Sequence, residues 1–454
     1  MSADDVPPTP FAPRSVFGPL LRHPNFRYFA FGQAVSQTGT WLQYTSMAWL
    51  TYDLGHSTFV LGLVAFAGQI PTFFLAPLAG VLSDRVNRRQ AIMLLQWIAM
   101  LQAATLSALV WARQINQWEI IAFSLVLGIV NAFEVPLRHA LVADLVDDRE
   151  DLGGAIAINS AIVNGSRLVG PLVAGLLLAT LGEAYCFLIN AITHIPVITA
   201  LFFMRNLAEP APAKKMAVRD GMVEGFTYAI GLPPVYSLLL FMCLVSVMGM
   251  QGSVVLPAIV EDLVHAGPDL YGEMTGATGV GAILAGFYLA TRKTVMGIGL
   301  RIVMAGFVYG GGMLLFTWTK VPGLMLAILA ITGFALMLIK AGANIVLQTV
   351  VREEMRGRVM SFYTMAVLGT APFGSLIAGT IAQFYGPLAS ITVSGVVCIA
   401  GSLAFAWMLP SLRKKAIEML DVAEGGSPLG DAMETTAEIP LPSTGSPLRP
   451  PEKE

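Results

Sequence analysis

The sequence has little charge, little cysteine and no clustered metal ligands. Only 12% of its 454 residues are charged, whereas soluble domains carry about 25%. The formal net charge is −2 and no basic stripe is present, so nothing indicates a nucleic-acid partner. Cys186, Cys243 and Cys398 all fall in apolar segments, without the spacing of a disulfide framework or a metal site. We therefore expect no bound metal and no cofactor.

Motifs of enzymes and of cleaved secretory proteins are also missing. The sequence has neither a His-Glu-x-x-His pattern nor a Gly-x-Ser-x-Gly elbow, so we expect no enzymatic activity. Residues 1–25 contain prolines and acids but no short apolar core with a cleavage site. A removable signal peptide is therefore not predicted, and the first apolar helix would direct insertion itself.

Long apolar segments dominate the chain instead. Hydrophobic residues make up 55% of it, and a helix needs about 20 of them in sequence to span a bilayer. We predict an all-α membrane protein with twelve transmembrane helices. The predicted segments are 28–50, 59–82, 91–111, 120–136, 152–181, 184–204, 235–260, 271–290, 302–319, 323–346, 359–384 and 388–409.

The distribution of basic residues predicts the orientation of these helices. Of the 27 Lys and Arg residues, 21 fall in loops and flanks on one side if both termini lie there. Two, Arg113 and Lys320, fall on the other side, two lie in the distal tail, and Arg167 and Lys340 lie within helices. Cytoplasmic loops are enriched in Lys and Arg. We therefore predict a multi-pass protein of the inner (plasma) membrane with both termini in the cytoplasm.

The chain also repeats itself at a shift of 204 residues. The stretch GPLVAG at 170–175 aligns with GSLIAG at 374–379. Two six-helix bundles related by an axis along the membrane normal would produce such a repeat. We place these bundles at residues 26–204 and 235–409.

Polar segments flank and join the two predicted bundles. Residues 1–25 form a cytoplasmic segment, and 410–454 form a disordered cytoplasmic tail, rich in Pro and Glu beyond 425. The connector at 205–234 carries an apolar residue at every fourth position, namely Val218, Met222, Phe226 and Ile230. This spacing fits an amphipathic helix on the inner membrane surface, although a plain linker is an equal alternative.

A charge-dense loop joins the second and third predicted helices. Residues 80–89 read GVLSDRVNRR, with one acid and three arginines. This resembles the corresponding loop of major facilitator superfamily transporters, Gly-x-Leu-x-Asp-Arg-x-Gly-Arg-Arg/Lys. Asn87 replaces the second glycine, and because Asn tolerates positive φ we expect the turn to persist. The resemblance implies a gating motif with Arg358, near the start of the eleventh helix, as its partner: Gly80, Asp84, Arg85, Arg88, Arg89 and Arg358.

Further motifs are similar to the bacterial enterobactin-exporter-like (transmembrane secretion effector) branch of this superfamily. They include NFRY at 25–28, PLRHALV at 136–142 and RGRVMS at 356–361. The resemblance covers about residues 25–410 and implies export of siderophores or other amphiphilic small molecules by proton antiport. Thr40 stands where some relatives have an acid, which argues against a proton carrier at that position.

Two basic residues inside predicted helices are candidate substrate ligands. A charged side chain at the centre of a membrane helix costs about 2.5–3.5 kcal/mol on insertion scales, so each needs a reason. Arg167 either binds an anionic substrate group or is a structural residue held by backbone carbonyls. Lys340 either has a substrate or coupling role or snorkels to the inner face.

Two other residues are candidates for proton coupling. Glu134 is either a proton site or the partner of Arg138, one helical turn further on. His194 could exchange protons near neutral pH, but a lone histidine in a membrane helix is also typical of a hydrogen-bonded structural residue.

The first and fifth predicted helices carry polar and helix-modifying residues. Gln33, Gln37 and Tyr44 share one helix face, which either lines a substrate cavity or makes interhelical hydrogen bonds. Asn164 is a weaker candidate for the substrate site. Gly170, Pro171 and Gly175 resemble the fifth-helix motif of antiporters and would bend the helix and permit close helix packing.

Together these features predict a secondary active transporter. It would export a small amphiphilic molecule, siderophore-like or drug-like, by alternating access with protons as the exchanged ion, and would act as a monomer in the bilayer. Because embedded acids are few, a neutral or anionic substrate is favoured over a cation. A proton-coupled uptake symporter and a non-transporting receptor or scaffold are the alternatives.

Overall fold

The computed structural model describes residues 17–83, 86–146, 148–204, 218–249, 252–291 and 297–423. All regular elements in these ranges are helices. Ten helical stretches among the described residues are long and apolar enough to cross a membrane. Helices α2 (Pro24–Asp53) and α11 (Pro268–Ala290) are not among these ten, although their 30 and 23 residues suffice for a span. Helix α2 is rich in polar residues and α11 is rich in glycine, which lowers the hydropathy of both.

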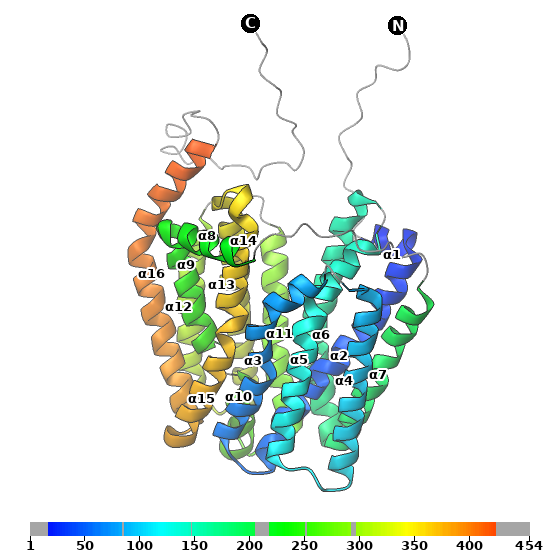
Figure 1. The fold of residues 1–454 in the computed structure, drawn as a ribbon. Coiled ribbons are helices and arrows are strands. Elements are labelled where there is room, and N and C mark those ends of the chain that lie inside the picture. Colours follow the sequence, from blue (N-terminus) through cyan, green and yellow to red (C-terminus); the bar gives the residue numbers. More distant parts are fainter. Residues whose placement is uncertain are drawn as a thin grey trace, which may run out of the picture.

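Seven helices precede residue 204 in the described part of the chain. After the short α1 (Gly18–Arg22), α2 packs against α6 and α7, α3 packs against α5, and α4 packs against α5 and α7. Their bounds are Thr58–Ser83 for α3, Arg88–Trp111 for α4, Gln117–Asp144 for α5, Arg149–Thr180 for α6 and Glu183–Phe203 for α7. In Figure 1, α4, α5, α6 and α7 occupy the right side of the molecule, and α3 lies in the middle of the view.

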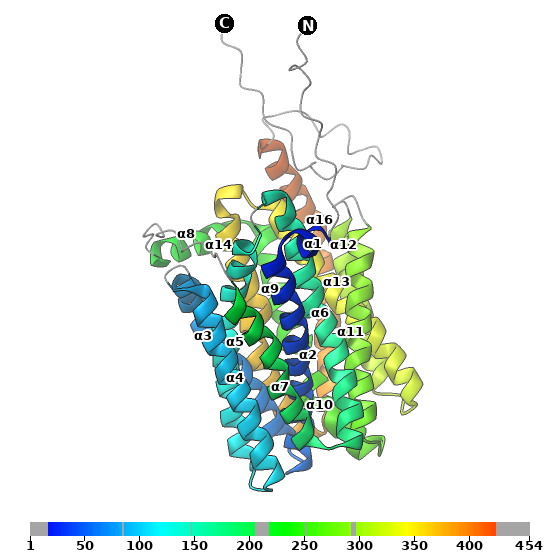
Figure 2. The ribbon, with the colours of Figure 1, turned by 90° about the vertical axis from the view of Figure 1, so that its right-hand side faces the viewer.

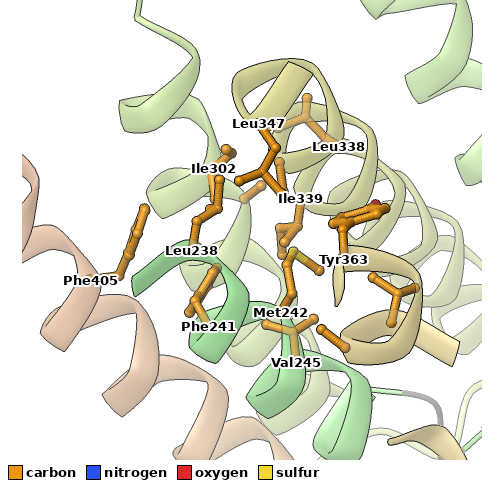
Figure 3. Close-up of a cluster of buried hydrophobic side chains, with 14 of the residues drawn as sticks. Leu238, Phe241, Met242, Val245, Ile302, Leu338, Ile339, Leu347, Tyr363 and Phe405 are labelled. Atoms are coloured by element: carbon orange, nitrogen blue, oxygen red, sulfur yellow. The ribbon is translucent and has the colours of Figure 1, made fainter. Parts of the chain in front are cut away.

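The remaining helices build the other side of the molecule in Figure 1. Their bounds are α8 Val218–Gly231, α9 Pro233–Gly249, α10 Gly252–Ala258, η1 Ile259–Leu263, α12 Ile298–Phe316, α13 Pro322–Val350, α14 Glu353–Thr364, η2 Met365–Gly369, α15 Ala371–Tyr385 and α16 Pro387–Ala423. Helices α9, α12, α13, α14 and α16 enclose a hydrophobic core that includes Phe241, Met242 and Ile339 (Figure 3). Burial of such apolar side chains holds this group together.

The lower end of the molecule in Figure 1, where α2 ends and α3 begins, is closed. We call the opposite end, where α2 begins and α5 ends, the upper end. One buried cluster at the lower end contains Trp49 and Leu61 from the first group of helices and Tyr271 and Ala382 from the second. The rings of Trp49 and Tyr271 stack with their centroids 5.9 Å apart. Apolar packing therefore seals the two groups against each other there.

Two glycine pairs bring backbones of the two groups into contact. A Cβ atom at Gly175 of α6 would lie 2.9 Å from the Cα of Gly272 in α11, and one at Gly379 of α15 would lie 3.0 Å from the Cα of Gly62 in α3. Such approaches leave no room for any side chain. Gly175 and Gly379 occupy the same position of the 204-residue repeat, so the repeat places equivalent glycines at both contacts.

The loop at 80–89 differs from the expected turn. Asn87 has φ −66° and caps α4, with its side chain accepting a hydrogen bond from the backbone N–H of Gln90. The expectation of a glycine-like turn at Asn87 is therefore wrong, because Asn serves here as a helix N-cap. Gly80 lies in α3, whereas Asp84 and Arg85 lie outside the described residues.

Two helical segments lie outside the predicted membrane spans, and the first of them is the amphipathic helix that was one of two alternatives for the connector. Residues Val218–Gly231 of the connector form α8, which crosses the upper end beside α14 in Figures 1 and 2. Helix α16 continues past Pro410 to Ala423, so the prediction of a disordered tail is wrong for its first part. The residues after Pro410, SLRKKAIEMLDVA, are mostly strong helix formers, which explains the continuation.

Substitution of Gly272 tests the glycine contact. A Cβ there would lie 2.6 Å from the Cα of Gly175, so we expect Gly272→Ala to destabilise the protein by about 1–3 kcal/mol through overpacking. The control is Gly286→Ala in the same helix, where no atom lies within 4 Å of the new Cβ. Thermal unfolding of both variants in detergent should show a lower Tm only for Gly272→Ala.

Candidate functional site

A buried polar cluster joins α2 to α5. Glu134 Oε1 accepts hydrogen bonds from Nε2 of Gln33 at 2.9 Å and Nε2 of Gln37 at 3.4 Å. Nη1 of Arg138 lies 3.4 Å from the same oxygen. Glu134 and Arg138 are only 5% and 4% exposed, and Nε of Arg138 has no hydrogen-bond partner. The structure thus contains the Glu134–Arg138 pair, which was one alternative for Glu134. It also contains interhelical hydrogen bonds of Gln33 and Gln37, which were one alternative for the polar face of the first predicted helix.

Tyr44 extends this cluster along α2. Its hydroxyl accepts a hydrogen bond from Nδ2 of Asn131 at 2.7 Å, and its ring centroid lies 5.7 Å from that of Trp41. Tyr44 and Trp41 are both half-buried. An aromatic surface therefore lies next to the charged cluster.

Arg167 lies over this aromatic surface from α6. Its guanidinium carbon is 5.2 Å from the ring centroid of Trp41, within the range of a cation–π interaction. The side chain is exposed and makes no hydrogen bond or ion pair within the described part of the chain. It is also close enough to Arg138 and to Lys340 of α13 for electrostatic repulsion. Arg167 is thus an exposed arginine whose neighbours Trp41, Arg138 and Lys340 come from three other helices.

Gly170 permits the approach of α2 that creates this arrangement. A Cβ at Gly170 would lie 2.5 Å from the Cβ of Trp41, so only glycine allows Trp41 to reach Arg167, one turn away. Helix α6 is continuous through Pro171, and Gly175 contacts α11 on another face. Nδ2 of Asn164 donates to the carbonyl of Ser160 in its own helix at 2.9 Å.

His194 lies in a different network. Its Nδ1 donates to Oε1 of Gln96 at 2.5 Å and lies 3.2 Å from Oγ of Ser36. The residue is 2% exposed, and its Nε2 is buried without a hydrogen-bond partner. The structure therefore places His194 at a packed seam between α2, α4 and α7, and none of its described contacts is with Glu134.

The arginines of the charged loop bind residues of the upper end. Nη1 of Arg88 lies 2.7 Å from Asp144 at the end of α5, and Arg89 donates to the carbonyls of Leu201 and Phe202 at the end of α7. Cations at a helix C-terminus are stabilised by its dipole. Arg358 pairs with Glu224 of α8 at 2.6 Å. The described contacts do not bring Arg88 or Arg89 to Arg358.

Polar contacts at the lower end were not predicted. The hydroxyl of Tyr52, in α2, donates to the carboxylate of Asp262 in η1. Nδ1 of His56 lies 3.5 Å from Glu261. The seventh predicted segment ends at Val260, and the sequence analysis assigns no role to the two acids that follow it. An acidic pair directly after a hydrophobic segment was the available signal.

Comparison with known proteins identifies the family. The model of the transmembrane secretion effector family matches residues 14–425. The chain belongs to the transmembrane secretion effector family. A staphyloferrin A transporter of Staphylococcus aureus is 23% identical over 395 residues, which cover 86% of this chain and 98% of the relative. The multidrug efflux pump Tap of Mycolicibacterium fortuitum is 25% identical over 409 residues, covering 87% and 97%.

Solved structures show the same fold. A POT family transporter has a TM-score of 0.70 at 12% identity and covers 85% of this chain and 96% of its own. A bacterial homologue of the human lysosomal transporter Spinster, in an inward-facing and occupied conformation, has a TM-score of 0.66 at 14% identity and covers 86% and 98%. The chain is therefore an integral membrane transporter of the major facilitator superfamily, and not an enzyme.

A double-mutant cycle tests the pair in the buried cluster of this transporter. Glu134→Gln leaves Arg138 as an uncompensated buried charge, and Arg138→Gln does the same to Glu134. We expect each single variant to lose about 3–5 kcal/mol of stability. The double variant should lose less than the sum of the two, since neither charge remains. Additive losses in thermal unfolding would contradict an energetically coupled pair.

Proposed function

We propose that this transporter exports a small amphiphilic molecule with neutral or anionic polar groups in exchange for protons. The observation that carries this proposal is the exposed guanidinium of Arg167 against the ring of Trp41. Guanidinium donors suit carboxylate, catecholate or hydroxamate oxygens, while Trp41 and Tyr44 offer apolar contact. The names of the relatives, a siderophore transporter and a multidrug efflux pump, support a substrate of this kind.

We further propose an arrangement in the membrane. Helices α2 and α11 complete twelve spans in two six-helix bundles, 26–204 and 235–409, within one monomer in the inner membrane. The upper end, where α1 begins and α16 ends, faces the cytoplasm because the basic loops gather there. The closed lower end and the exposed Arg167 then correspond to a state that is open to the cytoplasm, in which an exporter takes up its substrate.

One observation favours a second candidate, a proton-coupled uptake symporter. Arg138 is neutralised by Glu134 at 3.4 Å. An anion that approaches Arg138 competes with the Glu134 carboxylate, and protonation of Glu134 removes this competitor. Proton and anion would then bind to the same state of the protein and cross the membrane in the same direction. This is cotransport and not antiport.

Transport in proteoliposomes distinguishes these candidates. Under antiport through Glu134, Glu134→Gln should abolish accumulation driven by a proton gradient but retain substrate exchange, and Glu134→Asp should retain both. Under cotransport, binding of an anionic chelator should strengthen as the pH falls, and Glu134→Gln should remove this dependence. Loss of gradient-driven transport and exchange together in Glu134→Gln would assign this residue a purely structural role.

An efflux panel tests the substrate class. Cells that produce the transporter should export anionic chelators in preference to ethidium, because Arg167 repels a permanent cation. Arg167→Ala should lower chelator efflux by about 10-fold or more, the value of one charge-assisted hydrogen bond. The control is Arg113→Ala, an exposed arginine between α4 and α5. Strong ethidium efflux that persists in Arg167→Ala would contradict the proposal.

A further inference from the structure

Two cations without counterions lie at the interface of the helix groups. Arg167 of α6 makes no hydrogen bond or ion pair in the described structure, and the Nζ of Lys340 in α13 likewise has none. Lys340 is half-buried and repels Arg167 electrostatically. Arg167 is exposed and Lys340 is partly exposed, and neither charge is engaged by another described residue.

Among the described residues, neighbouring charges do not compensate this pair. The buried carboxylate of the cluster, Glu134, already accepts hydrogen bonds from Gln33, Gln37 and Arg138 on a single oxygen. Glu134 balances Arg138, which leaves two positive charges in excess. Unpaired cations at membrane depth are unfavourable unless a ligand supplies the counterions.

The position of Lys340 within α13 makes snorkelling an insufficient explanation for this residue. Lys340 lies ten residues before the end of α13 at Val350, which is about 15 Å along the helix axis at 1.5 Å per residue. A lysine side chain that only needed solvent would be placed nearer to that end. Its carbonyl also accepts a hydrogen bond from the hydroxyl of Tyr363 at 2.8 Å, which fixes this part of α13 against α14.

We propose that the substrate presents two acidic groups, one bound by Arg167 and the other by Lys340. This inference rests on the proposed transport function and narrows its substrate class from neutral or anionic amphiphiles to dianions. The two ligands come from α6 in one group of helices and α13 in the other. A dianion therefore screens their mutual repulsion and draws the two groups together around itself. Trp41, beneath Arg167, contacts the apolar part of the molecule that joins the two acids.

Binding of a matched series to the purified full-length protein tests this proposal. The probes are α,ω-dicarboxylates of increasing chain length, their monomethyl half-esters and their dimethyl esters, measured by calorimetry in detergent. The best dicarboxylate should bind about 10- to 100-fold tighter than its half-ester, because one charge-assisted contact is lost. One chain length should be optimal, since the two cations hold a fixed separation.

Variants identify the two cations as the ligands. Arg167→Gln and Lys340→Gln should each bind the dicarboxylate no better than its half-ester, whereas Lys320→Gln, at an exposed position near the lower end, should behave as the wild type. Arg167→Lys keeps the charge and should keep the preference for the diacid. Gel filtration and thermal unfolding establish that each variant is folded.

Three results would overturn the inference. They are equal binding of diacid and half-ester, no binding of any member of the series, and an unchanged preference in both charge-removing variants. None of these results bears on whether the protein exports amphiphiles, because the efflux panel measures that separately. Efflux of neutral or monoanionic compounds together with equal binding would leave the proposed function standing and reject the dianion.

Discussion

Close backbone contact between two pairs of helices is the constraint on which the arrangement depends. At Gly175–Gly272 and Gly62–Gly379 the helices approach so closely that a Cβ atom would lie about 3 Å or less from the facing backbone. The contacts between α6 and α11 and between α3 and α15 are where the first group of helices meets the second. They bring Trp49 onto Tyr271 and Tyr52 to Asp262 at the lower end. The exposed Arg167 lies on α6 nearer to the upper end, on the N-terminal side of Gly170.

The candidate site combines one ion pair, Glu134–Arg138, with two cations that have no counterion among the described residues. Glu134 and Arg138 form a buried, hydrogen-bonded unit that fixes α2 against α5. Arg167 and Lys340 stand apart from it and have no counterion in the described structure. A buried ion pair contributes little net stability, but removing one partner is costly. The paired charges therefore suit a structural or coupling element, and the unpaired ones suit a ligand.

Local sequence patterns predicted those features of the structure that depend on residues close together in the sequence. Hydrophobic segments located the membrane helices, and the spacing of four indicated the Glu134–Arg138 pair. Two features failed locally: Pro410 does not end α16, and Asn87 caps a helix where a positive φ was expected. The contact of Arg167 with Trp41 depends on Gly170 and on helix packing across many residues. The lower-end contacts of Asp262 and Glu261 lie in the short π-helix η1, which no hydropathy pattern reveals.

Comparison of the two copies of the internal repeat shows which backbone features they share and which charged residues occur in only one copy. Gly182 and Gly386 are 204 residues apart in the sequence and have φ values of +85° and +88°, so both copies keep a glycine with positive φ at the same position. The charged residues break this symmetry: the position equivalent to Arg167 is Ala371, and that equivalent to Lys340 is Pro136. A duplicated backbone thus supplies a symmetric frame. If the proposed dianion binds there, the asymmetric charges give it one orientation, because Arg167 meets one of its ends and Lys340 the other.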